Sequence, residues 1–265
     1  MAELTTRGQD SISDAEAFRS PYELWKQSEG LPTIRGLSVS NCYDVELVSW
    51  RSRGGSGIFV NLEGTGGFND CYICEIPPKG SLNPIRHIYD ELVFILRGQG
   101  ATTVWIDENR KQTFEWRERS YFAIPPNAWH QHHNLEGDQP ARYVAMTAMP
   151  RVIDTFKDLD FVFDNPYVFK SRFSGEDGYF QESEYVPGQR GGWTTNFVHD
   201  VLARTPTPGG VSNEGRGGGT VATVFNMVGG TVNRTARRGP WARTPSSIAT
   251  APASTCCCFV GRATR

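Results

Sequence analysis

Short apolar runs dominate the chain between positions 44 and 147. Eight runs of β-branched and aromatic residues are separated by Gly, Pro, Asn and charged residues. These runs are VELVSW, GIFVNL, CYICEI, LVFIL, TTVWI, TFEW, YFAI and RYVAMT. Turn residues recur at short intervals and no helical period interrupts the runs. The pattern therefore predicts an all-β fold, a double-sheet jelly roll or barrel, rather than alternating strands and helices.

The N-terminal flank has a different pattern. The segment from Ser13 to Gln27 is predicted to be helical, with Ser13 as the N-cap and Leu24 and Trp25 as apolar anchors. No other part of the chain is predicted to be helical. We therefore expect residues 1–43 to form an arm whose short helix packs outside the barrel, and residues 44–150 to form the barrel itself.

The C-terminal half lacks this strand pattern. Residues 151–217 begin with aromatic and acidic residues punctuated by Pro and Gly, as in a linker that packs along a surface. Beyond Pro206 the chain is rich in Gly, Thr and Arg, and only VATVFNMV looks like a strand. The last thirty residues are expected to be disordered.

Composition narrows the class of partner. With 27 basic and 29 acidic residues, the formal charge of −2 provides no field that would favour nucleic acid or an anionic membrane. The first twenty residues contain no apolar run of the kind found in a secretory signal, and no stretch is long enough to span a bilayer. We therefore expect a cytoplasmic protein that binds a small molecule.

Two cysteines form a C-x-x-C pair, Cys71 and Cys74, inside the run DCYICEI. Side chains three positions apart on a strand point to opposite faces of the sheet. Redox or zinc chemistry is therefore not predicted here, and the six cysteines imply no disulfide framework.

Two polar segments carry the candidate chemistry. In the first, GSLNPIRHIYDELVFILRG, His87 is followed by Glu91 and then by Gly98. In the second, RSYFAIPPNAWHQHHN, a Pro-Pro turn leads into His130 and then Asn134. The two segments resemble the paired motifs of the cupin superfamily, including the bicupins. The resemblance spans roughly residues 45–148 and implies a double-stranded β-helix.

The resemblance also implies a metal site made of His87, Glu91 and His130. Two imidazoles and one carboxylate, with open positions left on the ion, suit Fe(II) and also Mn, Co, Ni or Zn. The sequence departs from the family pattern at Ile85, which occupies the position of the first histidine. It also departs at the opening glycine of the second motif, which is replaced by Arg119 or displaced to Ser120. In the alternative reading, these polar residues are ordinary strand-end residues that bind no metal.

Further residues flank the expected ligands. His132 lies on the same strand face as His130 and is either a fourth ligand or, as we favour, a hydrogen-bond donor in the second shell. Arg86 and Tyr89 are also candidates for the second shell. No catalytic residue and no organic cofactor site are assigned.

The C-terminal end suggests an incomplete second barrel. Residues 218–265 begin like the second barrel of a bicupin but end in a cysteine triplet with no alternation. Reading the codons of Ser247 to Thr264 in a shifted frame permits a cupin-like metal motif. We hypothesise that a frameshift has left a remnant of the second cupin domain with a disordered tail.

Two functions follow from these observations. The first is a metal-dependent enzyme, an oxidoreductase such as a dioxygenase, that acts on a small oxygen-rich molecule. The alternative is a non-catalytic cupin that binds a small ligand or serves as an oligomerising scaffold. A homodimer is considered because cupins often dimerise.

Overall fold

The computed structural model describes residues 19–65, 67–181, 192–201, 203, 224–227 and 235–236. Three helices accompany the strands in these ranges: α2 (Pro21–Glu29), α3 (Met149–Phe156) and α4 (Leu159–Phe163). The strands are β1 (Thr33–Gly36), β2 (Val48–Trp50), β3 (Gly55–Leu62), β4 (Asp70–Ile76), β5 (Glu91–Arg97), β6 (Gln99–Trp105), β7 (Lys111–Arg117), β8 (Tyr121–Ile124), β9 (Trp129–Asn134), β10 (Ala141–Thr147), β11 (Gly192–Thr195), β12 (Phe197–Val198), β13 (Val224–Met227) and β14 (Thr235–Ala236).

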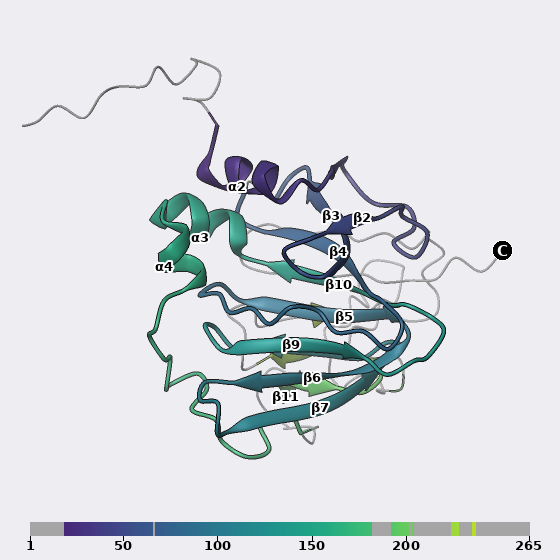
Figure 1. The fold of residues 1–265 in the computed structure, drawn as a ribbon, viewed down its shortest axis with the longest axis vertical. Helices are drawn as coiled ribbons and strands as arrows, with labels where there is room; N and C mark the ends of the chain where they lie inside the picture. Colours follow the sequence, from purple (N-terminus) through teal and green to yellow (C-terminus); the bar gives the residue numbers. More distant parts are fainter. Residues whose placement is uncertain are drawn as a thin grey trace, which may run out of the picture.

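The strands of the barrel form two sheets whose inner side chains share one apolar core. In Figure 1 the labelled strands of the larger sheet (β3, β4, β10 and β5) lie above those of the smaller sheet (β9, β6 and β7). The larger sheet has the order β1-β3-β4-β10-β5-β8-β12, with β2 paired to the outer side of β3, and the smaller has the order β7-β6-β9. Every strand pair in this barrel is antiparallel except β1 with β3. This is the jelly-roll architecture that the sequence predicts. Each of the eight expected runs overlaps one strand of the structure.

Period-2 alternation gives the larger sheet two buried faces. The inner face, with Phe59 and Cys74, belongs to the core inside the barrel, whereas Cys71 belongs to a second apolar cluster on the outer face. The expected separation of the two cysteines is thus confirmed. A sheet buried on both faces gives nearly continuous apolar runs, as in Leu92 to Leu96.

The N-terminal helix begins later than predicted. Arg19 and Ser20 are not helical, and α2 begins at Pro21. Ser20, not Ser13, is the N-cap, and its hydroxyl accepts a hydrogen bond from the backbone N–H of Glu23. The S-x-x-E spacing and the proline at the first helical turn are the signals that mark this start. Ser13 lies outside the described residues.

The prediction of a helix-free segment after the barrel is wrong. Helices α3 and α4 pack next to α2 at one end of the barrel (Figure 1). Pro150 lies in the first turn of α3, and the Asp158 carboxylate caps α4 by accepting from the N–H of Phe161. These helices have only eight and five residues, too few for a helical period to be visible in the sequence.

The segment after these helices contributes to the core rather than only covering it. Phe173, Phe180 and Phe197 are buried with the barrel interior, and Phe114 of β7 stacks on Phe180 at 4.3 Å between ring centroids. This aromatic cluster closes the open side of the smaller sheet.

The C-terminal region is described only in part. Strand β13 lies inside the predicted run VATVFNMV and pairs in parallel with β11. The rest of the proposed second-barrel remnant, its cysteine triplet and its expected disorder lie outside the described residues. Among the described helices, none has the length and apolarity needed to cross a membrane.

A buried carboxylate joins α2 to the barrel. Asp70 is 1% exposed and accepts hydrogen bonds from the hydroxyls of Tyr22 and Thr147. Desolvation raises the pKa of Asp70 to about 7, although these hydrogen bonds and the charge of Lys26 lower it. The folded protein therefore retains a proton on Asp70 at pH values where the unfolded chain has lost it.

Because Asp70 keeps this proton in the folded state, we expect the protein to lose stability as the pH rises. Because the folded-state pKa of Asp70 lies above the ordinary aspartate value of 3.8, unfolding becomes easier between about pH 4 and pH 7. Relative to Asp70→Asn, which does not ionise, the wild-type free energy of unfolding should fall by up to about 4 kcal/mol across this range. Urea unfolding of both proteins at pH 4.5, 6 and 8 measures the difference. A pH-independent difference would contradict the assignment.

Candidate metal centre

Three buried ligand residues meet inside the barrel. Glu91 is the first residue of β5, His130 lies on β9, and His87 lies in the loop that leads into β5. One potential ligand atom from each lies within 4.8 Å of the others, and each residue is at most 1% exposed. The structure thus brings together the three residues proposed as ligands from the sequence.

Backbone carbonyls orient both imidazoles. The Nδ1 of His87 lies 2.9 Å from the Tyr89 carbonyl oxygen, and the Nδ1 of His130 lies 3.3 Å from that of Ala128. Because a carbonyl oxygen only accepts, each Nδ1 carries the proton that it donates. In a neutral ring the lone pair is then on Nε2, which is the arrangement of histidines that bind metals.

The Nε2 atoms lack suitable partners. His130 Nε2 and Glu91 Oε1 are buried and have no hydrogen-bond partner among the described residues. His87 Nε2 lies 3.1 Å from Glu91 Oε2, so in the neutral ring a lone pair would face a carboxylate oxygen. A cation between these atoms would satisfy all of them, and two imidazole nitrogens with a carboxylate are ordinary ligands for a divalent transition metal.

The electrostatics of the site favour the metal-binding protonation states of Glu91 and His130. Burial alone would raise the pKa of Glu91, but its interaction with His87, with smaller contributions from His130 and Arg53, lowers the pKa to about 2. Desolvation keeps the pKa of His130 well below its usual value, against the opposing effect of Glu91. Near neutral pH, Glu91 is a carboxylate and His130 a neutral imidazole.

His132 lies beside this group but outside it. Its ring centroid is 5.5 Å from that of His130, and its Nδ1 lies 2.8 Å from Thr102 Oγ1. The Thr102 oxygen already accepts a hydrogen bond from the indole N–H of Trp116, so its own proton is free for His132 Nδ1. When Thr102 donates this proton, the His132 proton is on Nε2, an atom with no partner among the described residues.

The other flanking candidates are placed differently. The Tyr89 ring stacks on His87 with centroids 3.8 Å apart and an interplanar angle of 4°. The Arg86 guanidinium instead lies over the Trp129 ring and pairs with Asp164 at 2.6 Å. Tyr89 therefore contacts a proposed ligand directly, whereas the recorded contacts of Arg86 are with other groups.

The comparisons with known proteins agree with this architecture. The sequence profile described as "Cupin domain" matches residues 72–147, which include all three proposed ligands. The chain carries a cupin domain. No curated protein sequence matches the chain.

Several solved structures are similar to part of this chain. Oxalate decarboxylase from Lactobacillus farciminis, solved as a formate complex, is 20% identical over 41% of this chain and 32% of its own, with a TM-score of 0.35. Vicilin from tomato, Solanum lycopersicum, is 12% identical over 37% and 29%, with a TM-score of 0.33. The Cnp3 cupin domain from Schizosaccharomyces pombe is 15% identical over 44% and 77%, with a TM-score of 0.35. The chain thus spans about a third of the length of the first two, and these likenesses carry no argument about function.

The departures from the cupin motifs have clear structural positions. Arg119, which replaces a motif glycine, adopts a left-handed backbone with φ of 72°, a conformation that glycine adopts without strain. Ile85 forms a β-bridge with His130, since the N–H of each donates to the carbonyl of the other. An apolar side chain in this position adds no ligand to the site.

One residue of the interior escaped sequence reasoning. Arg53 follows β2 and is only 4% exposed, and its charge influences Glu91, His130 and His132. The RSRGG turn that contains it looks like an ordinary solvent-exposed loop, so no sequence signal distinguishes Arg53 from its exposed neighbour Arg51.

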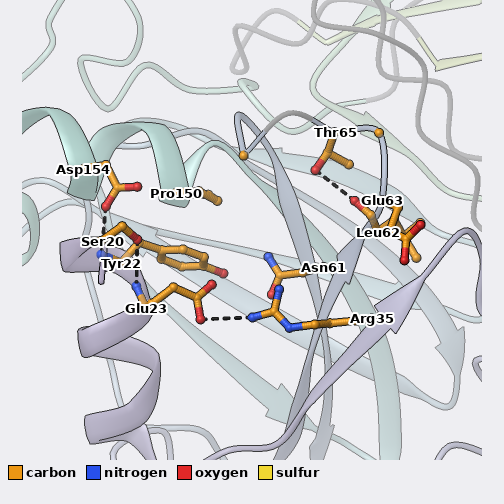
Figure 2. Close-up of a pocket in the computed structure, with 12 residues that line it drawn as sticks. Ser20, Tyr22, Glu23, Arg35, Asn61, Leu62, Glu63, Thr65, Pro150 and Asp154 are labelled. Atoms are coloured by element: carbon orange, nitrogen blue, oxygen red, sulfur yellow. Dashed lines mark hydrogen bonds and ion pairs between the residues drawn. The ribbon is translucent and has the colours of Figure 1, made fainter. Parts of the chain in front are cut away.

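A surface pocket lies elsewhere. A cavity of about 450 Å³ opens between α2, α3 and the end of β3, and its lining includes Glu23, Arg35 and Asp154. Figure 2 shows that Glu23 pairs with Arg35 and that Asp154 accepts from the N–H of Tyr22. None of the three proposed ligands lines this cavity, and Glu23, Arg35 and Asp154 already have partners.

Proposed function

We propose that this cupin binds a divalent transition metal through His87, Glu91 and His130 and acts as a metal-dependent oxidoreductase of the dioxygenase type. The observation that carries the proposal is the convergence of three buried ligand residues, among which His130 Nε2 and Glu91 Oε1 have no hydrogen-bond partner in the described part of the chain. Fe(II) suits this donor set best, and Mn, Co, Ni or Zn also fit it.

The roles of the chain's residues follow from their contacts. The Tyr89 and Ala128 carbonyls hold the two imidazoles with Nε2 toward the ion, and Glu91 supplies the negative charge. The His132 Nε2–H would donate to a ligand bound beside the ion. When bound, such a metal would supply open coordination positions and Lewis acidity for an oxygen-rich molecule and for dioxygen. We propose a small molecule as substrate and a cytoplasmic location.

A second function, small-ligand binding without catalysis, is favoured by one observation. Ile85 leaves the site with three protein ligands instead of the four of a complete motif. The two functions differ in one measurable property, since only the enzyme consumes dioxygen in a substrate-dependent reaction.

Elemental analysis of protein purified without chelator tests the metal site directly. We expect close to one transition metal ion per chain in the wild type and almost none in His87→Ala, because two donors hold a divalent ion poorly. Dioxygen uptake in the presence of catechols, keto acids or diketones then tests the activity.

His133→Ala is the matched control for this experiment. His133 lies on β9, the strand that also carries His130, but it is partly exposed. Its ring forms hydrogen bonds with Ser81 and Thr103 and not with the three proposed ligands. The control should retain full metal content. A folded wild type without metal, even after incubation with Fe(II), would refute the proposed site.

A further inference from the structure

His87 is held differently from the other two proposed ligands. Glu91 and His130 lie on β5 and β9, where backbone ladders pair them with neighbouring strands. His87 lies in the loop between the β-bridge of Ile85 and the start of β5. Its backbone carbonyl oxygen accepts a hydrogen bond from the N–H of Asn127 at 2.7 Å. The position of this ligand therefore depends on what packs against its loop.

Helix α4 packs directly against this loop. The Val162 carbonyl oxygen accepts from the backbone N–H of Ile88, the residue after His87, at 3.1 Å. Asp164, the C-cap residue of α4, pairs with Arg86, the residue before His87, at 2.6 Å. The Asp164 side chain is 77% exposed, so this ion pair contributes little, whereas Val162 is fully buried. The backbone hydrogen bond is therefore the more important of these two links.

Tyr89 contacts His87 in two ways. Its ring stacks on the imidazole with centroids 3.8 Å apart, and its carbonyl oxygen accepts from Nδ1 at 2.9 Å. The stack restricts the plane of the imidazole, and the hydrogen bond sets the direction of Nε2. Phe163, the last residue of α4, meets the Tyr89 ring edge to face, with centroids 6.0 Å apart and an interplanar angle of 87°. Helix α4 therefore reaches His87 through two aromatic side chains.

Phe163 is itself anchored to the barrel. Its ring stacks on Trp25 of α2 with centroids 5.5 Å apart. Trp25 in turn meets Phe59 of β3 edge to face at 5.6 Å, and both of these residues are at most 9% exposed. The contacts join five rings in one continuous row, which runs through Phe59, Trp25, Phe163, Tyr89 and His87. Close packing of this kind leaves each ring few alternative positions.

We propose that α4 positions the metal ligand His87, and that Phe163 and Tyr89 are the positioning residues through which it acts. The inference rests on the proposed function, because the property it concerns is affinity for the metal. Ligand distances in a metal site vary by only about 0.2 Å, so a ligand on a loop has to be held by its surroundings. Replacement of residues that orient a ligand typically weakens metal binding about 10- to 100-fold.

Titration of Co(II) into metal-free protein, followed by visible absorption, tests the proposal. The spectrum measures both the affinity and the coordination geometry of the bound ion. We expect Phe163→Leu, which keeps an apolar side chain but loses the aromatic contact with Tyr89, to bind Co(II) at least about tenfold more weakly than the wild type. Phe161→Leu is the matched control and should bind within about twofold of the wild type. Phe161 belongs to the same helix, but it is 42% exposed and its ring contacts Phe156 at 4.7 Å.

Variants of Tyr89 distinguish positioning from simple filling of the core. Rings that only fill the core would affect folding stability and leave the metal affinity of the folded protein unchanged. Tyr89→Leu should weaken Co(II) binding at least about tenfold and alter the Co(II) spectrum, because the stack on His87 is lost. Tyr89→Phe keeps the ring and the backbone carbonyl, so it should restore the wild-type affinity and spectrum.

Two results would overturn the inference. The first is wild-type Co(II) affinity in either Phe163→Leu or Tyr89→Leu. The second is a Tyr89→Phe variant that binds Co(II) as weakly as Tyr89→Leu does. If Phe163→Leu does not fold, Phe163→Met, whose flexible side chain fills irregular space, takes its place with the same expected result.

Amide hydrogen exchange separates this inference from the proposed function. In metal-free protein, exchange of the Ile88 N–H measures the contact with α4, because this N–H donates to the Val162 carbonyl. We expect exchange at least about tenfold faster in Phe163→Leu and unchanged in Phe161→Leu. If the wild type binds no Co(II), the metal site is refuted, while faster exchange in Phe163→Leu alone would still support the positioning of the loop by α4. Wild-type exchange in Phe163→Leu would overturn the inference whether or not metal binds.

Discussion

Replacing Glu91 with glutamine is expected to weaken divalent metal binding more than about 100-fold. Loss of a residue that only orients a ligand weakens metal binding by up to about 100-fold, and Glu91 is proposed to be a ligand itself. The substitution preserves volume and removes the one negative charge among the three ligands. The metal-dependent stabilisation should disappear too, since a ligand at 100 times its Kd stabilises a protein by about 2.7 kcal/mol. Thermal melts with and without added metal, together with competition against a chromophoric chelator, measure both effects.

Glu115→Gln is the control, because Glu115 is an exposed residue of β7 and its replacement changes net charge by the same amount. It should melt as the wild type does and gain the same stabilisation from metal. If Glu91→Gln retained wild-type affinity, the carboxylate would not be a ligand. In the presence of chelator, the Glu91→Gln variant should be no less stable than the wild type. This comparison separates loss of metal from misfolding.

Replacing Arg142 with methionine is expected to cost about 3 kcal/mol of folding free energy, in the range for breaking a buried ion pair by removal of one partner. Arg142 lies on β10 with 8% of its side chain exposed, and its Nε pairs with Glu75 at 2.9 Å. Its Nη1 donates to the carbonyl oxygens of Cys42, Tyr43 and Val45, which fastens the loop before β2 over the outer face of the larger sheet. Urea unfolding monitored by tryptophan fluorescence measures the change.

Arg97→Met is the matched comparison. Arg97 pairs with the same oxygen of Glu75 at 2.8 Å, but 45% of its side chain is exposed. Exposed ion pairs contribute little, so we expect a loss below about 1 kcal/mol. Equal losses in the two variants would show that the charge of Glu75, rather than the buried loop carbonyls, accounts for the effect.

The strand pattern and the proposed ligands were predictable because they depend on local sequence. Strands buried on both faces need continuous apolar runs, and the turns between them need Gly, Pro and Asn. The spacing from His87 to Glu91 and from Pro125 to His130 is likewise a property of short segments. These sequence patterns can be recognised without knowing which strands pair with each other.

The errors concern short elements whose stability comes from contacts. Helix α2 begins at Pro21 because Ser20 caps it and because the Asp154 carboxylate of α3 accepts from the N–H of Tyr22. Helix α4 has five residues and buries Val162 against the barrel. Isolated helices of this length are unstable in water, so their sequences alone carry a weak helical signal.

The amino-acid pattern was enough to predict a strand-rich cupin domain with two histidines and a glutamate in motif positions. The folded arrangement was needed to show which buried polar atoms lack partners, that Nε2 rather than Nδ1 of His87 and His130 faces the site, and that Arg53 is buried while Arg51 is exposed. The physical reason is that pattern and turn chemistry are local. Burial, tautomer and charge pairing instead depend on atoms that come together from distant parts of the chain.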